Sequence, residues 1–314
     1  MIIERYTPAM KPAWDAFAME SRNATFLHRR GYMDYHADRF RDHSLVARAT
    51  AGGRIVALLP ANAESDGTLA SHRGLTYGGW LTPPRHFSTE TMLELFDALT
   101  DHMRAEGLRR LVYRPVPHIY HRYPAEDDVY ALWRLGARMD ACGASATVAL
   151  RRAPLLDRGS KSAVSAVRRA GVSLGPSHDF EAFWAILEEV LASRHETRPV
   201  HTLAEMRMLR DRFPDNIRLY AAVADGRMEA GVVVYRCGTV AHAQYIAASP
   251  RARTMRLLPA LYSHIMDCEC EGMEWFDFGI STEQGGRVLN AALDSHKSRL
   301  GGRCTLYQSF VLEL

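Results

Sequence analysis

The sequence lacks any feature that would place it in a membrane or in the secretory pathway. None of the apolar runs in its 314 residues approaches the roughly 20 residues of a membrane-spanning helix. Residues 1–5 also lack the basic start and the following apolar stretch of a signal peptide. We therefore expect a cytoplasmic protein with no membrane-inserted segment.

Cysteine is scarce as well. The five cysteines are odd in number and form no CxxC pair, which argues against a disulfide framework and against a cysteine-based structural zinc site. We expect reduced thiols and no bound metal.

Neither sign of charge dominates, and the formal net charge is only +3. That balance does not require a nucleic-acid partner, but it suits a small anionic ligand that carries phosphates. Lysine occurs only as Lys11, Lys161 and Lys297, whereas arginine fills the other cationic positions. Each lysine is notable because its compact ammonium can lose its proton, which an arginine in a protein does not.

The sequence does contain a repeated order of elements, and a chain of this length favours two domains. Hydrophobic patterning and turn residues predict a hairpin, a third strand, a helix and a last strand in each half. The first copy has strands at 45–50, 55–61 and within 69–81, a helix at 88–107 and a strand at 108–113. The second copy has strands at 217–224, 229–235 and 240–248, a helix that ends at Gly272 and a strand at 273–278. The alternative is that this order recurs by chance in α/β chains.

Helical stretches precede the hairpin in both copies. They are predicted at 10–19 and 31–40 in the first copy, and at 160–170, 179–193 and 203–212 in the second. The last of these begins at a capping box formed by Thr202 and Glu205. Periodic structure is interrupted near 151–159, so we expect one unit at 1–150 and another at 151–314.

This order resembles the GNAT acyltransferase fold, and two such units in tandem resemble the Fem family of peptidoglycan aminoacyl ligases and related polysaccharide-cluster N-acyltransferases. The residues that carry the resemblance are 75–79, 117–127, 160–161, 167–170, 276–283, Gly286, 289–290, Leu293, 296–297 and 300–302. The resemblance implies an α/β (α+β) fold with two tandem GNAT-like units, each a mixed, mainly antiparallel sheet flanked by helices.

The resemblance also implies an acyl-donor site in the second unit. In the GNAT fold the third strand parts from the strand after the helix, and its unpaired amides hold the donor arm. A helix rich in arginine then begins, and its N–H groups favour a phosphate. The expected donor-binding residues are Tyr245, Ile246, Ala248, Arg251, Arg253, Thr254 and Arg256. The alternative is an ordinary solvated first turn.

One departure from the family pattern concerns the donor. Acyl-CoA-binding GNAT members carry a Gly-x-Gly/Ala turn at this point, and residues 249–256 contain no glycine. Fem-type ligases, which use aminoacyl-tRNA, lack the turn too. The donor therefore stays open between acyl-CoA, an acyl carrier protein and aminoacyl-tRNA.

Three residues are candidates for catalysis. Lys297 matches the family lysine thought to stabilise the developing oxyanion or the leaving group. Asp277 alternates with Phe276 and Phe278, so it faces the other side of its strand and could act as a base or as an orienting anion. Glu283 is the rival carboxylate. The structural alternatives are a lysine that complements a helix dipole and carboxylates that cap a loop.

The acceptor is expected to contact the loop at 117–124 and nearby glycines at the junction of the two units. His118 and His121 have H-x-x-H spacing, but the sequence offers no further ligand for a metal site. The candidate acceptor-binding residues are Tyr77, Gly78, His118, Tyr120, His121, Ser281, Asn290 and His296.

We interpret the chain as an N-acyltransferase that moves an acyl group from a thioester donor to a small-molecule amine. The acceptor class suggested by the resemblance is a nucleotide-linked amino sugar or a cell-envelope precursor. A Fem-like aminoacyl-tRNA-dependent ligase is the second interpretation. It ranks second because the Fem ligases of peptidoglycan often carry an inserted coiled-coil arm, and the sequence shows no long heptad segment. A non-catalytic ligand-binding tandem domain is the third. The oligomeric state is left open.

Overall fold

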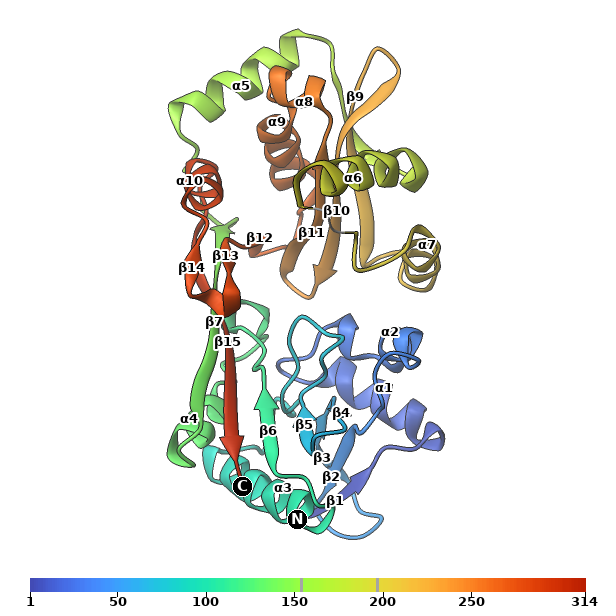
Figure 1. Ribbon diagram of the computed structural model, residues 1–314, viewed down its shortest axis with the longest axis vertical. Helices are drawn as coiled ribbons and strands as arrows, with labels where there is room; N and C mark the ends of the chain where they lie inside the picture. The colour runs from blue at the N-terminus through green and yellow to red at the C-terminus, as the bar shows by residue number, and fades with distance from the viewer. Residues whose placement is uncertain (153–154, 196–197) are drawn as a thin grey trace. The chain divides into compact units, whose positions relative to one another are not determined.

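The computed structural model describes residues 1–152, 155–195 and 198–314, which form two compact units (Figure 1). Unit 1 contains Met1–Ala144, Thr282–Val288 and Thr305–Leu314, whereas unit 2 contains Ser145–Ser281 and Leu289–Cys304. A single boundary near residue 150 was expected, which would place Thr282–Val288 and Thr305–Leu314 in unit 2 instead of unit 1. Residues 153–154 of the expected boundary lie outside the described residues.

Unit 1 combines two sets of strands with helices. Its antiparallel sheet has the order β1-β2-β3, and a second set of strands has the order β4-β5-β6-β15. The strands are β1 (Ile2–Arg5), β2 (Leu45–Arg48), β3 (Ile55–Leu59), β4 (Asn62–Ala63), β5 (Thr68–Ala70), β6 (Arg110–Tyr113) and β15 (Arg303–Glu313). The helices are α1 (Lys11–Glu20), α2 (Arg30–Met33), α3 (Thr89–Ala105) and α4 (Asp127–Arg134). Strand β5 is parallel to β6 and β15 is antiparallel to it.

Helix α3 is the best-predicted element of unit 1. Ser88 is its N-cap and accepts a hydrogen bond from the backbone N–H of Thr91 at 3.2 Å. Its apolar positions repeat every three to four residues and lie in the unit's core, namely Met92, Leu95, Phe96, Leu99 and Met103. Gly107 follows the helix at a φ of 70°, a conformation that glycine adopts without strain.

Two predicted elements of unit 1 are shorter in the structure. The third strand, expected within 69–81, is confined to β5, because His72 has a φ of 61° and turns the chain away from the extended direction. The helix expected at 31–40 ends as α2 and continues only as a 3-10 turn (Asp34–His36). Strands β1, β4 and β15 and helix α4 were not predicted.

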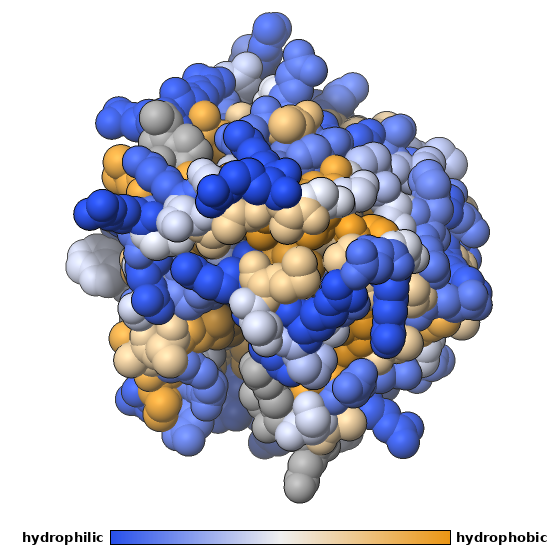
Figure 2. Space-filling view, turned by 90° about the horizontal axis from the view of Figure 1, so that it is seen from above, coloured by the Kyte–Doolittle hydropathy of each residue, from blue (hydrophilic) through white to orange (hydrophobic). Residues whose placement is uncertain are grey.

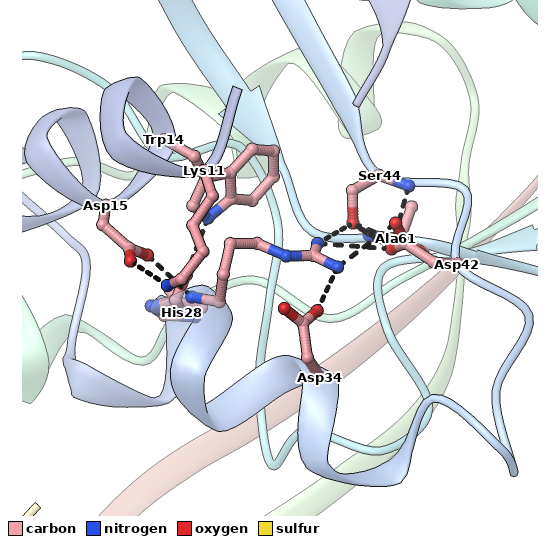
Figure 3. Close-up of polar contacts among 9 residues, drawn as sticks. Lys11, Trp14, Asp15, His28, Asp34, Asp42, Ser44 and Ala61 are labelled. Carbon is pink, nitrogen blue, oxygen red and sulfur yellow. Dashed lines mark hydrogen bonds and ion pairs between the residues drawn. The ribbon is translucent and has the colours of Figure 1, made fainter. Parts of the chain in front are cut away.

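A buried arginine connects the first helices of unit 1 to the sheet. Arg30 is 4% exposed and its guanidinium contacts the carboxylates of Asp34 and Asp42. It also donates to the Ser44 hydroxyl at 3.1 Å. Figure 3 shows Asp34, Asp42 and Ser44 together on one side of the drawn residues and Asp15 on the other. Asp15 accepts a hydrogen bond from the backbone N–H of Arg30.

Unit 2 holds a sheet of the order β7-β12-β11-β10-β9-β8. Its strands are β7 (Arg138–Ala149, which begins in unit 1), β8 (Ser173–Ser177), β9 (Ile217–Ala224), β10 (Arg227–Cys237), β11 (Val240–Ala248) and β12 (Trp275–Ile280). Its helices are α5 (Arg158–Arg169), α6 (Phe180–His195), α7 (Leu203–Arg212), α8 (Pro250–Met255), α9 (Leu257–His264) and α10 (Ala291–Arg299). All neighbouring strands are antiparallel except β11 and β12, which are parallel.

Helices cover both faces of the unit 2 sheet (Figure 1). Helices α5 and α9 pack together and α9 lies against β9 and β10, while α6 lies against β10 and β11. Gly231 of β10 allows the ring of Phe183 to approach, since a Cβ there would lie 2.5 Å from that ring. The mixed, mainly antiparallel sheet and the two GNAT-like units predicted from the sequence are confirmed.

The helix predicted to end at Gly272 is interrupted in the structure. Arg256 has left-handed backbone angles and separates α8 from α9, and a π-helical turn (Ile265–Glu269) follows α9. Val288 and Leu289 form the short strand β14, which pairs with β13 (Thr282–Glu283), and α10 begins directly after this pair, at Ala291. None of the helices in the described part of the chain has the length and apolar character needed to cross a membrane.

Candidate functional site

Strands β11 and β12 part after three residue pairs. They are in register at Val240 with Trp275, Ala241 with Phe276, and His242 with Asp277. Within the described residues, no part of β12 pairs with β11 beyond His242. We call the His242–Asp277 pair the splay point. Residues 243–248 of β11 therefore present backbone groups to the gap between the two strands, as expected from the sequence.

A bulge lies immediately beyond the splay point. Val233 of β10 faces Tyr245, but its neighbour Val234 faces Ala243, so Gln244 is an extra residue on β11. A bulge of this kind leaves one residue without a ladder partner and changes the direction of the strand. It accordingly alters the course of β11 where the gap opens.

Asp277 lies at the centre of a hydrogen-bond network and is fully buried. One carboxylate oxygen accepts from the Ser145 hydroxyl at 2.5 Å and from the Gly279 backbone N–H at 3.0 Å. The other lies 2.9 Å from Nδ1 of His242. Phe276 and Phe278 belong to the core on the opposite side of β12, so the predicted alternation is confirmed. With no exposed surface, Asp277 orients neighbouring groups and does not itself meet a ligand in this conformation.

Lys297 reaches the end of β12 from α10. Its ammonium donates to the carbonyl oxygens of Gly279 and Ile280, each at 2.8 Å. The side chain is almost entirely buried, and this burial lowers its pKa to about 8, although Asp277 and Asp294 act to raise it. Two of the three ammonium hydrogens are used in these bonds, so one can still serve a ligand.

A cavity of about 590 Å³ opens between helices of unit 2. Its lining comes from the start of α5, the end of β11, the α8–α9 corner and the end of α10. The lining residues are Asp157, Gly159, Ser160, Ala248, Ala252, Arg253, Arg256, Leu258, Pro259, His296 and Arg299. We call this cavity the arginine pocket. On the face that Figure 2 shows, hydrophilic residues dominate the surface and hydrophobic areas lie among them.

The arginine pocket is positively charged. Arg253, Arg256 and Arg299 supply permanent cations, while Asp157 is committed to capping α5 through the Ser160 N–H at 2.6 Å. Burial, followed by the charges of Arg299, Lys297 and Arg256, lowers the pKa of His296. A pocket with this charge is suited to phosphate groups.

Two of the expected donor-binding residues are engaged elsewhere. Arg251 pairs with Asp225 at 2.5 Å and with Glu229 at 3.5 Å, and it does not line the arginine pocket. The Thr254 hydroxyl donates to the Pro250 carbonyl within α8. Arg251 and Thr254 of α8 thus already have partners within the protein. Of the predicted donor-binding residues, only Ala248, Arg253 and Arg256 line the arginine pocket.

Tyr245 and Ile246 contribute to opposite faces of β11. The ring of Tyr245 packs edge-on against Trp184 of α6, and its hydroxyl lies 2.6 Å from Nδ1 of His201. Burial raises the pKa of Tyr245 to about 12. Ile246 packs against the core formed with α9. Both side chains therefore support the strand, and only their backbone groups can face the gap.

The expected acceptor residues of unit 1 form a buried aromatic group. Tyr77 packs against Tyr120 with ring centroids 4.6 Å apart, and the Tyr120 hydroxyl lies 2.7 Å from that of Tyr307. Gly78 is required by close packing, since a Cβ there would lie 2.3 Å from the carbonyl oxygen of Ser71. This packing by itself accounts for a glycine at this position, while contact of Gly78 with the acceptor stays a prediction.

The two histidines of the H-x-x-H sequence have different surroundings. His118 is exposed, whereas His121 lies 2.8 Å from the carbonyl oxygen of Val116 and has a pKa lowered by burial. No cluster of three or more potential metal ligands occurs among the described residues.

The remaining candidates lie on either side of the division between the units. Glu283 is exposed on β13 in unit 1. Ser281 is buried in unit 2 and its hydroxyl has no hydrogen-bond partner among the described residues. Asn290 caps α10 by accepting from the Leu293 N–H at 3.1 Å, which is a structural function.

Sequence reasoning missed His242, Arg299 and Ser145. His242 and Asp277 are each the third residue of their observed strand. The second of these strands was predicted to start at 273, so aligning the predicted starts would not have placed the two residues side by side. Arg299 follows Lys297 by two residues, but only the packing of α5 against the end of α10 turns it into a pocket residue.

Comparisons with known proteins agree with this architecture. Residues 159–285 match the family model for the acetyltransferase (GNAT) domain. No curated protein matches the sequence. The resemblance to tandem-GNAT, Fem-like acyltransferases is confirmed by this domain match together with the folds of solved structures.

Three solved structures are similar over nearly the whole chain. FemX has a TM-score of 0.69 at 12% identity, covering 100% of this chain and 98% of that chain. L-PGS from Bacillus licheniformis has a TM-score of 0.63 at 12% identity, with 99% and 92% covered. The tandem GNAT protein from the clavulanic acid biosynthesis pathway has a TM-score of 0.52 at 14% identity, with 99% and 97% covered. At these identities the likeness establishes a shared fold.

Proposed function

We propose that the chain is an N-acyltransferase that binds an acyl donor in unit 2 and transfers the acyl group to an amine. The observation that carries this proposal is the gap between β11 and β12, which begins at the splay point and extends toward the arginine pocket at Ala248. Six residues of strand span roughly 20 Å. A donor anchored by its phosphates in the pocket would therefore extend along the unpaired edge of β11 toward Asp277 and Lys297.

Lys297 has the clearest role in this proposal. Attack of an amine on the donor carbonyl places negative charge on the carbonyl oxygen and later on the leaving group. The remaining hydrogen of the Lys297 ammonium would stabilise that charge, while the Gly279 and Ile280 carbonyls hold the side chain in place. Burial removes competing water and so strengthens the interaction.

The donor we favour is a thioester, acyl-CoA or an acylated carrier protein, with a nucleotide-linked amino sugar or a cell-envelope precursor as the amine. Aminoacyl-tRNA is the second candidate. It is supported by the higher TM-score of FemX than of the tandem GNAT protein, since Fem-type ligases use aminoacyl-tRNA, and by the lack of glycine in residues 249–256. Both donors carry phosphates and suit an arginine-lined pocket.

Donor binding can be tested by thermal unfolding of the full chain. Coenzyme A, acetyl-CoA or a UDP-linked amino sugar should raise the melting temperature if it binds the native state. Retention of alanyl-tRNA on a filter, without any shift from coenzyme A or acetyl-CoA, would favour the aminoacyl ligase. If acetyl-CoA, an acylated carrier protein and alanyl-tRNA all fail to bind, the protein is not an acyltransferase of either kind, and a non-catalytic binding role remains.

A further inference from the structure

We infer that His242 is the general base of the transfer reaction and that Asp277 positions it. The pair joins β11 to β12 at their last common register position, where the gap opens. This inference rests on the proposed acyl transfer to an amine, and it identifies a catalytic residue of that same site.

The geometry assigns different roles to the two residues. Asp277 has no exposed surface, whereas 14% of the His242 side chain is exposed, so only His242 can meet a substrate. The 2.9 Å contact between Nδ1 of His242 and the Asp277 carboxylate favours the tautomer with hydrogen on Nδ1. The lone pair then lies on Nε2, which can accept a proton. Asp277 is in turn held by Ser145 and Gly279.

The alternation of side chains places His242 on the face opposite the core residues of its strand. Ala241 and Ala243 on β11 and Phe276 on β12 belong to the core that includes α9. His242 and Asp277 therefore lie on the other face, which α6 covers along β10 and β11. An amine approaching from that face would meet His242 while the donor occupies the gap.

The neighbouring titratable groups are few. Tyr235 of β10 is the register partner of His242, Asp277 adjoins it on β12, and Lys297 reaches the end of β12 from α10. The Asp277 carboxylate is thus in direct contact with the imidazole of His242, and the Lys297 ammonium lies beyond it.

The step balances as follows. Nε2 of His242 takes a proton from the substrate ammonium, and the freed nitrogen lone pair forms the new C–N bond at the donor carbonyl carbon. The bond from that carbon to the leaving sulfur or oxygen breaks, and the leaving group keeps the electron pair. The nitrogen's second proton passes to the leaving group or to solvent, and His242 returns its proton to solvent.

The test uses substitution by asparagine, whose amide can occupy the place of Nδ1 and still donate to Asp277, while Nε2 is lost. Transfer from acetyl-CoA and from alanyl-tRNA is measured with two acceptors, glycinamide, which is partly protonated at neutral pH, and hydroxylamine, which is neutral there. His242→Asn should slow transfer to glycinamide by about 10²-fold or more and transfer to hydroxylamine by only about threefold. The rise of the wild-type rate with pH should be lost in the variant.

His264→Asn provides a matched control, because His264 is also a histidine beside a carboxylate, 3.7 Å from Glu269 on the α9 side of unit 2. Its rates should equal those of the wild type. Equal losses with both acceptors in His242→Asn, or no loss, would overturn the inference while leaving acyl transfer standing. Absence of transfer by the wild-type protein from acetyl-CoA, from an acylated carrier protein and from alanyl-tRNA would instead overturn the proposed function.

Discussion

The ammonium nitrogen of Lys297 lies 2.8 Å from the carbonyl oxygen of Gly279. Gly279 has a φ of 79°, a left-handed conformation that favours glycine, and lies where the register between β12 and β7 shifts, one residue before the end of β12. The same glycine donates its N–H to Asp277. A single residue thus links the buried lysine to the buried carboxylate at the splay point.

Lys297→Met should remove a pH-dependent part of the stability. Burial lowers the pKa of Lys297 to about 8 in the folded state, against about 10.4 in an unfolded chain. Between these values the unfolded chain binds more protons than the folded one, so this group makes stability rise with pH. Urea unfolding should show the wild type gaining about 2–3 kcal/mol more than Lys297→Met from pH 7 to pH 10. Parallel pH profiles would contradict this.

Lys297→Ala should reduce turnover by orders of magnitude while the protein remains folded. The variant loses the cation at the donor carbonyl, and loss of one such donor costs about 10²–10³ in kcat. The wild-type rate should fall as the pH passes about 8, because Lys297 then loses its charge. A wild-type rate that does not fall there, or unchanged turnover in Lys297→Ala, would remove the lysine from the mechanism.

Arg256→Gly should weaken donor binding without harming the fold. Arg256 lines the arginine pocket but has a φ of 56°, which glycine adopts more easily than other residues. Loss of its charged hydrogen bonds should raise the donor Kd about 10-fold to 100-fold. Arg251→Ala is the control, since it removes the same charge from an arginine paired with Asp225 outside the pocket. Equal effects of the two variants would exclude the pocket as the donor site.

Gly286→Ala should severely destabilise unit 1. Gly286 has a φ of 93°, and a Cβ there would lie 1.8 Å from the carbonyl oxygen of Cys142. We expect the free energy of unfolding to fall by more than about 3 kcal/mol. Gly107→Ala shares the positive φ but meets no atom within 4 Å, and should cost about 1–2 kcal/mol. Chemical denaturation of both variants would separate the two costs.

Arg30→Met should destabilise unit 1 by about 1–3 kcal/mol. The substitution keeps much of the side-chain volume but leaves Asp34, Asp42 and Ser44 without their buried cation. As a control, Arg104→Met breaks an exposed pair with Asp101 and should change stability by no more than about 0.5 kcal/mol. Similar losses from both variants would contradict the importance of burial.

Local patterns in the sequence were sufficient to predict the bounds of several helices and strands. Helix α7 and strands β9 and β11 have the bounds predicted from the sequence. Thr202 and Glu205 form both contacts of the expected capping box. These features depend on residues within a few positions of one another, so hydrophobic period and capping chemistry determine them directly.

The chemistry of the candidate site was decided by the tertiary structure. The sequence identified Asp277 and Lys297 but did not reveal that His242 would contact Asp277, because that contact depends on the register of two strands separated by a helix. It also did not reveal that Asp225, in the turn between β9 and β10, would pair with Arg251. Short-range order is encoded by neighbouring side chains, while the partner of a charged group depends on which distant segments the packed core brings together.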